Sequence, residues 1–296
     1  MSDFTPQKYA LSVDTWSPVD NVFKPYKKND RGGGSVSIST NQLDSKVLRI
    51  TTPPMMTWGI SDYVDDKTGE SDGRFTMTLN FPNNDYVTPE TNALLEKMLA
   101  FENAILDKAV ENSEQWFGKK SSREICEHTF FSSIKYRKIK DSNSFDYDKP
   151  PSLRVRVPCY DGKWGISLFD SDKNPLYPPE DPNSQKTPPD LVEKMSNIAC
   201  AIQCGGVWFG GKGWGVTWRL NQAIVQKKKK YDFDNDVCII DISSTDKQKL
   251  DNPVTTEEEV ETDSTQVDDS DEEVPVKVEP EVKPKKKIVK KKVVAA

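Results

Sequence analysis

GGVWFGGKGWGVTWRLNQAIVQ, residues 205–226, is the stretch that decides the fold of this 296-residue chain. It contains four aromatic residues and six glycines, and four lysines follow it directly at residues 227–230. Apolar side chains alternate with polar or small ones from Trp214 to Leu220, which is the period of a strand with one buried face. The glycines between Phe209 and Trp214 predict the turn that joins this strand to the preceding one. We therefore expect an antiparallel hairpin here.

The same alternation marks other strands, and one helix separates them. Half-buried strands are predicted at residues 75–81, 153–157, 164–168 and 198–204, with shorter candidates at 35–40, 47–51 and 57–60. Thr88 is a suitable N-cap before Pro89. Apolar residues then recur at spacings of three or four: Leu94, Met98, Phe101, Ile105 and Ala109. The pattern predicts a long amphipathic helix that ends near Gly118, and a weaker pattern suggests a second helix near residues 119–130.

The predicted order is several strands, one helix and more strands, joined by Pro-rich connections. This order is typical of a small closed barrel with elaborated loops. We predict a mainly β fold with one long helix (α+β), an OB-fold-like antiparallel barrel over residues 1–245. Ten acidic residues and no Lys or Arg lie in residues 257–273, and seven lysines and no acid lie in 283–292. Such blocks cannot bury enough apolar surface to fold, so residues 246–296 are predicted to be a disordered tail, acidic and then basic.

The net charge of −6 is unevenly distributed along the chain. Residues 255–296 carry −4, so the predicted folded body is close to neutral at −2. The cations of this body are clustered, at residues 24–31, 135–140, 154–156 and 227–230. Clustering rather than net charge decides whether a surface can bind an anionic polymer, so these clusters are candidate contacts.

Catalysis, metal binding and export find little support in the sequence. His128 is the one histidine and lacks a Ser-His-Asp or phosphate-loop context, so an enzyme is not expected. Cys200 and Cys204 would lie about 13 Å apart on a strand, too far to ligate one ion, so they are expected in the core. Neither a metal nor a cofactor is predicted. Five cysteines without framework spacing, no leader pattern and no apolar span favour a soluble intracellular protein without membrane contact.

The rings and cations around the hairpin are the candidate binding residues, because base stacking needs exposed ring faces and phosphates need cations. Trp208 and Phe209 lie at the glycine-rich turn, where their rings can stay exposed or fold back as a lid. Trp218 is expected in the core, whereas Trp214 can lie in the core or at the barrel mouth. The charged candidates can equally be solvated surface residues. The candidate nucleic-acid contacts are Trp208, Phe209, Lys212, Trp214, Arg219, Lys227, Lys228, Lys229, Lys230, Lys135, Tyr136, Arg137, Lys138, Arg154 and Arg156.

Several segments in fixed order carry a resemblance to a known family. They are GRFTMTLNFPNNDYVTPETNALLEKMLAFENAILDKAVENSEQWFGK, LRVRVPCY, FDSDKNPL and ACAIQCGGVWFGGKGWGVTWRLNQAIV. This order resembles the replicative single-stranded DNA-binding proteins of short-tailed phages, and most of all their counterparts in large eukaryotic DNA viruses. The resemblance covers residues 73–226 and the tail. It implies a sequence-independent single-stranded DNA-binding protein of viral DNA replication or recombination, in the host nucleus or at a cytoplasmic viral replication site.

The resemblance also implies partners, and here the sequence leaves alternatives. In the family the acidic tail contacts polymerase and helicase, which are therefore expected partners beside single-stranded DNA; a homodimer is also considered. This chain departs from the family by ending in KPKKKIVKKKVVAA, which can bind DNA, pair with the acidic block or act as a nuclear import signal. The rival hypothesis is a virion or structural protein whose aromatic hairpin is a protein interface, since Trp, Tyr, Phe and Arg also anchor interfaces.

Overall fold

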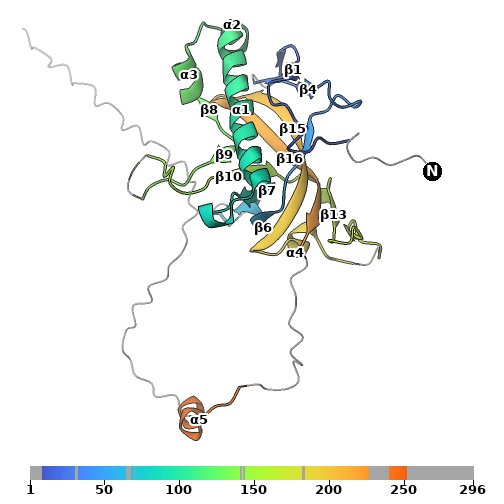
Figure 1. Ribbon diagram of the computed structural model, residues 1–296, viewed down its shortest axis with the longest axis vertical. Helices are drawn as coiled ribbons and strands as arrows, with labels where there is room; N and C mark the ends of the chain where they lie inside the picture. The colour runs from blue at the N-terminus through green and yellow to red at the C-terminus, as the bar shows by residue number, and fades with distance from the viewer. Residues whose placement is uncertain are drawn as a thin grey trace, which may run out of the picture. The chain divides into compact units, whose positions relative to one another are not determined.

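A computed structural model describes residues 9–30, 33–64, 68–69, 71–140, 142, 144–181, 184–226 and 240–251. The chain divides into two compact units, Met1–Tyr231 and Asp232–Ala296. The first unit contains all the strands of the described residues (Figure 1). Lys227, Lys228, Lys229 and Lys230 lie outside the described residues, so their predicted phosphate contacts stay predictions.

The first unit is built around a closed five-stranded barrel. Its strands are β6 (Met55–Val64), β7 (Ser71–Asn80), β10 (Ser152–Arg156), β15 (Ser196–Phe209) and β16 (Trp214–Val225). They pair in the order β6-β7-β10-β16-β15 and back to β6. All pairings are antiparallel except β10 with β16, which is parallel. With these five strands numbered 1 to 5 in chain order, the spatial order is 1-2-3-5-4-1, which is that of an OB-fold. The predicted fold class is therefore confirmed, with one parallel pairing in an otherwise antiparallel barrel.

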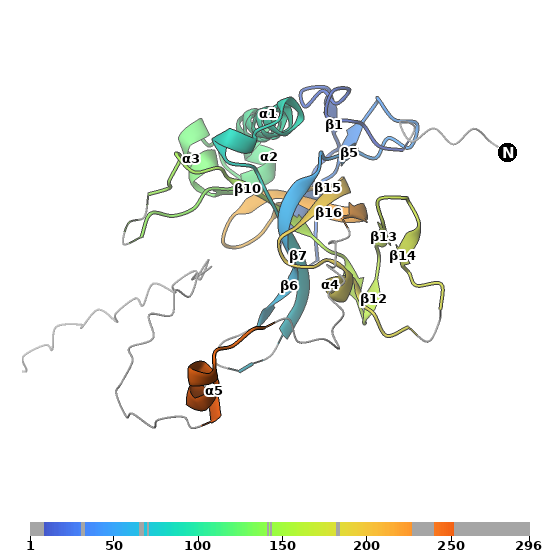
Figure 2. The ribbon, with the colours of Figure 1, turned by 60° about the horizontal axis from the view of Figure 1, so that its bottom comes forward.

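Helix α1 (Pro89–Glu111) crosses the barrel and closes its core (Figures 1 and 2). It begins as predicted: the Thr88 Oγ1 accepts from the Thr91 N–H at 3.2 Å, and the Thr91 Oγ1 accepts from the Thr88 N–H at 3.0 Å. The five apolar residues that predicted the helix are all fully buried. The Phe101 ring lies 5.6 Å from Trp16 and 5.5 Å from Trp218. These contacts join the N-terminal segment, the helix and the barrel, and they confirm Trp218 as a core residue.

The long helix is shorter than predicted because the chain turns at Asn112. A second helix, α2 (Ser113–Phe117), follows and ends at Gly118, whose φ of 75° is a left-handed cap. Helix α3 (Arg123–His128) fulfils the prediction of a second helix near residues 119–130. Arg123 bonds Asn103 at 2.8 Å and also pairs with Asp107, so α3 is attached to α1.

Short strands surround the barrel. They are β1 (Asn21–Phe23), β2 (Lys27–Lys28), β3 (Gly34–Val36), β4 (Ile38–Thr40), β5 (Arg49–Thr51), β8 (Phe130–Phe131), β9 (Ile134–Lys135), β11 (Cys159–Tyr160), β12 (Lys163–Trp164), β13 (Ser167–Phe169) and β14 (Pro175–Tyr177). Of these, β1 with β4 and β11 with β12 form two separate two-stranded sheets, and the others belong to the barrel sheet. The 3-10 turn η2 (Asn84–Tyr86) and helix α4 (Pro188–Leu191) complete the unit. The single strand predicted at residues 164–168 is divided into β12 and β13. Strands β8 and β9 pair with β16 and β10 respectively.

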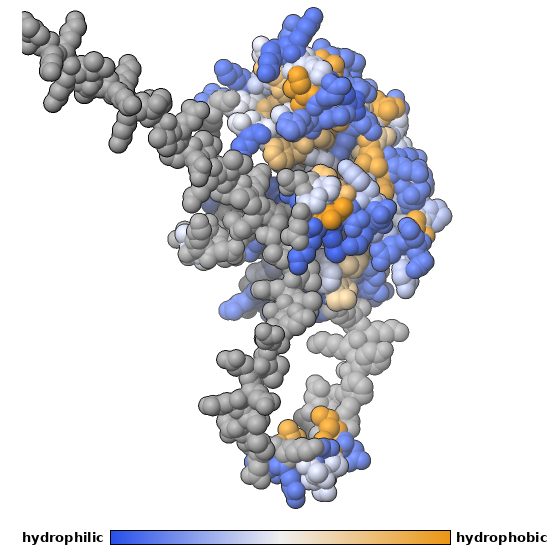
Figure 3. Space-filling model, turned by 90° about the vertical axis from the view of Figure 1, so that its left-hand side faces the viewer, coloured by the Kyte–Doolittle hydropathy of each residue, from blue (hydrophilic) through white to orange (hydrophobic). Residues whose placement is uncertain are grey.

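The second unit contains one described helix, α5 (Ser244–Asp251). Residues 246–251 of the predicted tail belong to this helix, and residues 252–296 lie outside the described part of the chain. The Ser243 Oγ accepts from the Asp246 N–H at 3.1 Å and donates to its carboxylate at 2.7 Å, which is a helix-starting cap. Among the described residues no helix is long and apolar enough to cross a membrane. On the face of the molecule shown in Figure 3, apolar residues form small separate patches among hydrophilic ones.

Candidate nucleic-acid interface

Strand register places one ring pair on the outer face of the hairpin tip. Residues in register across β2, β3, β15, β16 and β8 form the outer ring row: Lys27, Ser35, Trp208, Gly215 and Phe131. Residues in register share a face of the sheet. Trp208 is 37% exposed, and its ring stacks on Phe131 with centroids 5.8 Å apart and planes 26° apart. An exposed, stacked indole of this kind offers a face to a further flat group.

Glycine makes this arrangement of rings possible. A Cβ at Gly215 would lie 3.3 Å from the Trp208 ring and 2.5 Å from the Phe131 carbonyl oxygen. The Trp208 ring also lies 3.6 Å from where a Cβ of Gly210 would be. The two aromatic side chains therefore lie across bare backbone, which gives a physical reason for part of the glycine content of residues 205–226.

The residue beside each member of the outer ring row on its strand belongs to the inner ring row, on the opposite face: Lys28, Gly34, Phe209, Trp214 and Phe130. Trp214 is only 2% exposed, and its Nε1 donates to the Cys126 carbonyl at 3.2 Å and the Thr129 Oγ1 at 3.1 Å. The prediction of Trp214 as a nucleic-acid contact is thereby corrected, because a buried ring with a satisfied N–H is a core residue.

Phe209 is half-buried in the same cluster of rings. Its ring stacks parallel to Trp214 at 6.0 Å with planes 9° apart. It also meets Tyr26 and Trp116 at 5.4 Å and Phe117 at 5.7 Å. The sequence pattern predicted Trp208 and Phe209 together at an exposed turn. Strand β15 instead continues through Phe209, so the two neighbours point to opposite faces.

A second row of the outer face is cationic. Residues in register across β5, β15, β16, β10 and β7 form the arginine row: Arg49, Gln203, Arg219, Arg156 and Thr76. Arg49 Nε donates to Gln203 Oε1 at 3.0 Å. Arg156 and Arg219 are direct neighbours across the parallel pairing, and no ion pair found among the described residues involves either. Adjacent like charges repel, so this pair favours an anionic ligand.

Both rows lie on one continuous surface. Gly215, Thr217 and Arg219 occupy alternate positions of β16 and therefore share its outer face; Arg219 is exposed, Thr217 is half-buried, and Gly215 is covered by the Trp208 and Phe131 side chains. Four residues of strand separate the two rows, which corresponds to about 13 Å. A Cβ at Gly205 would lie 3.2 Å from the Arg219 Nε, so the Arg219 side chain lies over this bare glycine. The outer face therefore presents stacked rings and arginines a few nucleotide lengths apart.

Strands β9 and β10 add further cations to this face. Lys135 is in register with Ser152 of β10, and Arg154 and Arg156 follow at successive outward positions. Arg154 is exposed, whereas Lys135 and Arg156 are half-buried. Lys212 is exposed in the turn between β15 and β16. The structure thus brings the predicted Lys135, Arg154, Arg156 and Arg219 to one side of the barrel.

The remaining predicted cluster lies in the connection between β9 and β10. Tyr136 contacts Tyr147 with centroids 4.8 Å apart, and burial raises the pKa of Tyr136. Tyr147 is 71% exposed and also meets Phe145 at 6.3 Å. Arg137 and Lys138 are exposed, and the backbone of Lys138 forms an isolated antiparallel β-bridge with Phe145. Sequence reasoning missed both added rings, because their approach to Tyr136 depends on the hairpin that closes this connection.

A buried carboxylate fixes the segment between β8 and β9. Glu102 of α1 is 6% exposed and accepts three hydrogen bonds: from the Ser133 N–H and Oγ at 2.7 Å, and from the Ser132 Oγ at 2.6 Å. A buried carboxylate is stable only with such partners. Glu102 thereby positions Phe131, one residue before this segment, and Lys135, two residues after it.

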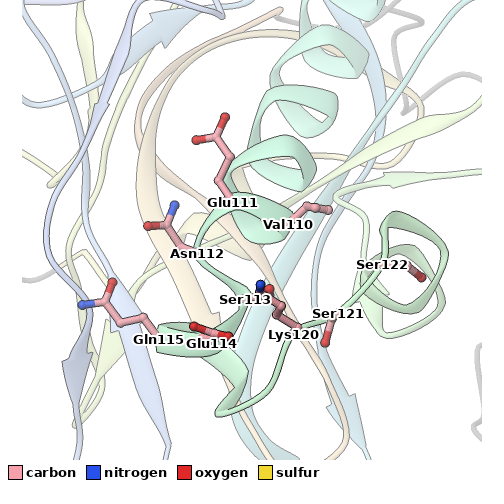
Figure 4. A pocket seen from close by; sticks show the side chains of 9 residues that line it. All are labelled: Val110, Glu111, Asn112, Ser113, Glu114, Gln115, Lys120, Ser121 and Ser122. Atoms are coloured by element: carbon pink, nitrogen blue, oxygen red, sulfur yellow. The ribbon is translucent and has the colours of Figure 1, made fainter.

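Other groups in the described residues offer no catalytic arrangement. Cys200 and Cys204 are buried as predicted, and burial raises the pKa of Cys204 to about 12. No group of metal ligands was found among the described residues. A hollow of about 560 Å³ lies where α1 meets α2 (Figure 4). There the side chains of Glu111, Gln115 and Ser122 point in different directions rather than toward one point, so they do not form a reactive site.

The fold and the site together define a class: an OB-fold barrel whose outer face carries stacked rings and arginines. A scan against protein-family models found no match, and a search of curated proteins found none. Among solved structures, the single-stranded DNA-binding protein from bacteriophage Enc34, in complex with single-stranded DNA, is similar over 70% of this chain and 96% of that one. The identity is 10% and the TM-score 0.35.

A second similar structure comes from another phage. It is gp2.5, a single-stranded DNA-binding protein encoded by bacteriophage T7, which is similar over 67% of this chain and 99% of its own. The identity is 11% and the TM-score 0.38. TM-scores this low do not establish a common fold. The fold assignment therefore rests on the strand pairings described above.

Proposed function

We propose that this protein binds single-stranded DNA without sequence preference and takes no catalytic part. The observation that carries the proposal is the position of the exposed Trp208–Phe131 stack on the same outer face as Arg219 and Arg156. Ring stacking contributes about 1–3 kcal/mol per base and accepts any base. Arginines contact phosphates irrespective of sequence.

The geometry favours a single strand over a duplex. Bases of a duplex are stacked on each other and cannot reach a protein ring, whereas those of a single strand can turn toward it. The rings and the arginines lie about 13 Å apart along β16, which a flexible strand can span with successive nucleotides. In an OB-fold barrel, the face of the second and third strands is a common site for oligonucleotides. Here those strands are β7 and β10, and of the proposed contacts Arg154 and Arg156 lie on β10.

The biological setting is proposed from the order of sequence motifs alone. We place the activity in DNA replication or recombination of a DNA virus, in the host nucleus or at a cytoplasmic replication site. Polymerase or helicase would be contacted through the tail beyond residue 246, and the protein would act as a monomer or homodimer. These roles follow the family resemblance and need tests of their own.

A titration tests the proposed function directly. Full-length protein is titrated into a labelled oligothymidylate and into a duplex of equal length, each at two salt concentrations. We expect tighter binding to the single strand and a steep loss of affinity with salt, since each phosphate contact contributes a slope of about −0.7 in log K against log salt. Equal binding to the duplex contradicts the proposal. Binding that persists at high salt favours the rival protein-interface hypothesis, because apolar contacts strengthen with salts such as sulfate.

A further inference from the structure

A second hollow, of about 370 Å³, lies on the inner side of the hairpin tip, opposite the exposed face of Trp208. Its walls are mainly aromatic, and the turn Gly210–Gly213 forms part of its rim. The side chains that matter for its chemistry are Tyr26, Trp116, Phe117, Phe209, Lys212 and Trp214. Its volume lies within the range of about 300–1,000 Å³ that is usual for small-ligand sites.

Glycines shape this hollow. The Tyr26 ring occupies the place of a side chain at Gly34, where an added Cβ would overlap the Tyr26 hydroxyl oxygen. Tyr26 therefore meets Phe209 edge to face at 5.4 Å and forms one wall. At the rim the turn is closed by the Gly210 N–H bond to the Gly213 carbonyl at 2.8 Å. Nothing lies within 4 Å of a Cβ at Gly211, so this part of the rim is open.

Cations as well as rings lie at or near this hollow. Lys212 lies in its rim, and no carboxylate is among the described residues that line it. Lys28 is in register with Gly34 on the same face as Phe209. Aromatic walls beside cations suit a flat base that carries a phosphate.

We infer that this hollow takes one nucleobase of the bound strand. The inference rests on the proposed function and adds a second stacking site to it. Trp208 and Phe209 are consecutive and face opposite sides at the tip, so a strand that passes around the short glycine turn meets Trp208 on one side and the hollow on the other. A base in the hollow would anchor the strand at the tip of the hairpin.

Filling the rim tests the inference. Gly211→Leu places a bulky side chain where a Cβ meets nothing and leaves the outer ring row unchanged. Gly165→Leu is the matched control, because Gly165 is exposed, lies outside the hollow and gives an added Cβ only an ordinary 3.5 Å contact. We expect Gly211→Leu to weaken oligothymidylate binding about tenfold with an unchanged salt slope, since a base is displaced while the phosphates stay bound.

Two results of this experiment overturn the inference. Affinity equal to that of the Gly165→Leu control shows that no base enters the hollow, as would be the case for a protein-docking pocket. A loss of affinity that comes with a smaller salt slope shows that phosphates were displaced instead. Thermal melting of both variants confirms that the fold is retained.

Photocrosslinking of the wild-type chain keeps the test independent of any variant. An oligonucleotide containing 5-bromodeoxyuridine is irradiated in complex with the protein, and the crosslinked peptides are mapped. Crosslinks to Tyr26, Phe117 or Phe209 support the inference, whereas crosslinks confined to Trp208 and Phe131 overturn it. If the wild-type protein fails to bind the oligonucleotide at all, the proposed function itself is wrong, which separates the two failures.

Discussion

Trp208 and Phe209 are neighbours in sequence, yet they lie in opposite environments. Trp208 is opposite Gly215, and its ring stacks on Phe131 at the surface. Phe209 is opposite Trp214 and is surrounded by aromatic rings. The residue opposite each ring on the paired strand therefore determines the environment of that ring. Opposite a glycine the ring lies on bare backbone at the surface, and opposite a tryptophan it packs in a cluster of rings.

The same contrast separates stability from binding at the hairpin tip. Trp214 of the inner ring row packs against rings of β15, α2 and β8, so it should contribute mainly to folding. The outer ring row leaves the face of Trp208 accessible, so it should contribute mainly to binding. Substitutions of Trp214 and Trp208 should consequently change different measured quantities, stability for the first and binding for the second.

The largest expected effect is on the inner ring row. Trp214→Ala removes a buried indole with two hydrogen bonds, and such a change costs about 3–5 kcal/mol of the free energy of unfolding. Urea unfolding followed by circular dichroism measures this. Trp208→Ala is the comparison and should lose less, because Trp208 is 37% exposed whereas Trp214 is 2% exposed. Equal losses from the two variants would contradict the division into packing and binding faces.

The elements of this fold could be predicted wherever local chemistry determines them. The Thr88 cap and the spacing of Leu94, Met98 and Phe101 predicted α1, and alternation predicted the barrel strands and the burial of Trp218. The end of β15 could not be predicted, because glycines near Phe209 signal a turn without fixing its first residue. Trp208 and Phe209 were therefore assigned to one surface when the strand separates them.

The arginine row was beyond sequence reasoning for a different reason. Arg49 and Arg219 are 170 positions apart, and only their common partner Gln203 on β15 brings them to one row. Strand alternation indicates that Arg219 faces outward but not which residues lie beside it. Phe131 was missed likewise, since its contact with Trp208 depends on the Glu102 bonds that hold the segment after it.

A glycine substitution tests how the two rows depend on each other. Gly215→Ala puts a Cβ 2.5 Å from the Phe131 carbonyl and 3.3 Å from the Trp208 ring. Such overpacking costs about 1–3 kcal/mol, and here it should also displace the ring pair and weaken oligonucleotide binding. Gly165→Ala is the control, because Gly165 lies outside both ring rows and the hollow, and its added Cβ makes only an ordinary 3.5 Å contact. Unchanged stability and affinity in Gly215→Ala would show that the ring pair does not need bare backbone.

Removing the exposed ring tests the binding row alone. Trp208→Ala should weaken oligothymidylate binding by about 1–3 kcal/mol, the contribution of one stacked base, with a nearly unchanged salt slope. Fluorescence anisotropy of a labelled oligonucleotide measures both quantities. Trp58→Ala serves as the control, because Trp58 is exposed on β6 and belongs to neither ring row. If both variants lose the same affinity, Trp208 has no special part in binding.

The smallest effect is expected in the arginine row, and it is of a different kind. Replacing Arg156 and Arg219 together with Gln should reduce the salt slope by about 0.7 for each phosphate that is no longer bound. Affinity should fall equally for all sequences, because phosphates carry no sequence information. Stability should stay the same or rise slightly, since two adjacent like charges are removed. Lys163→Gln, an exposed cation on β12, is the control. If the double variant keeps the wild-type salt slope, the phosphates of the bound strand lie elsewhere. The outer ring row would then bind bases without help from Arg156 and Arg219.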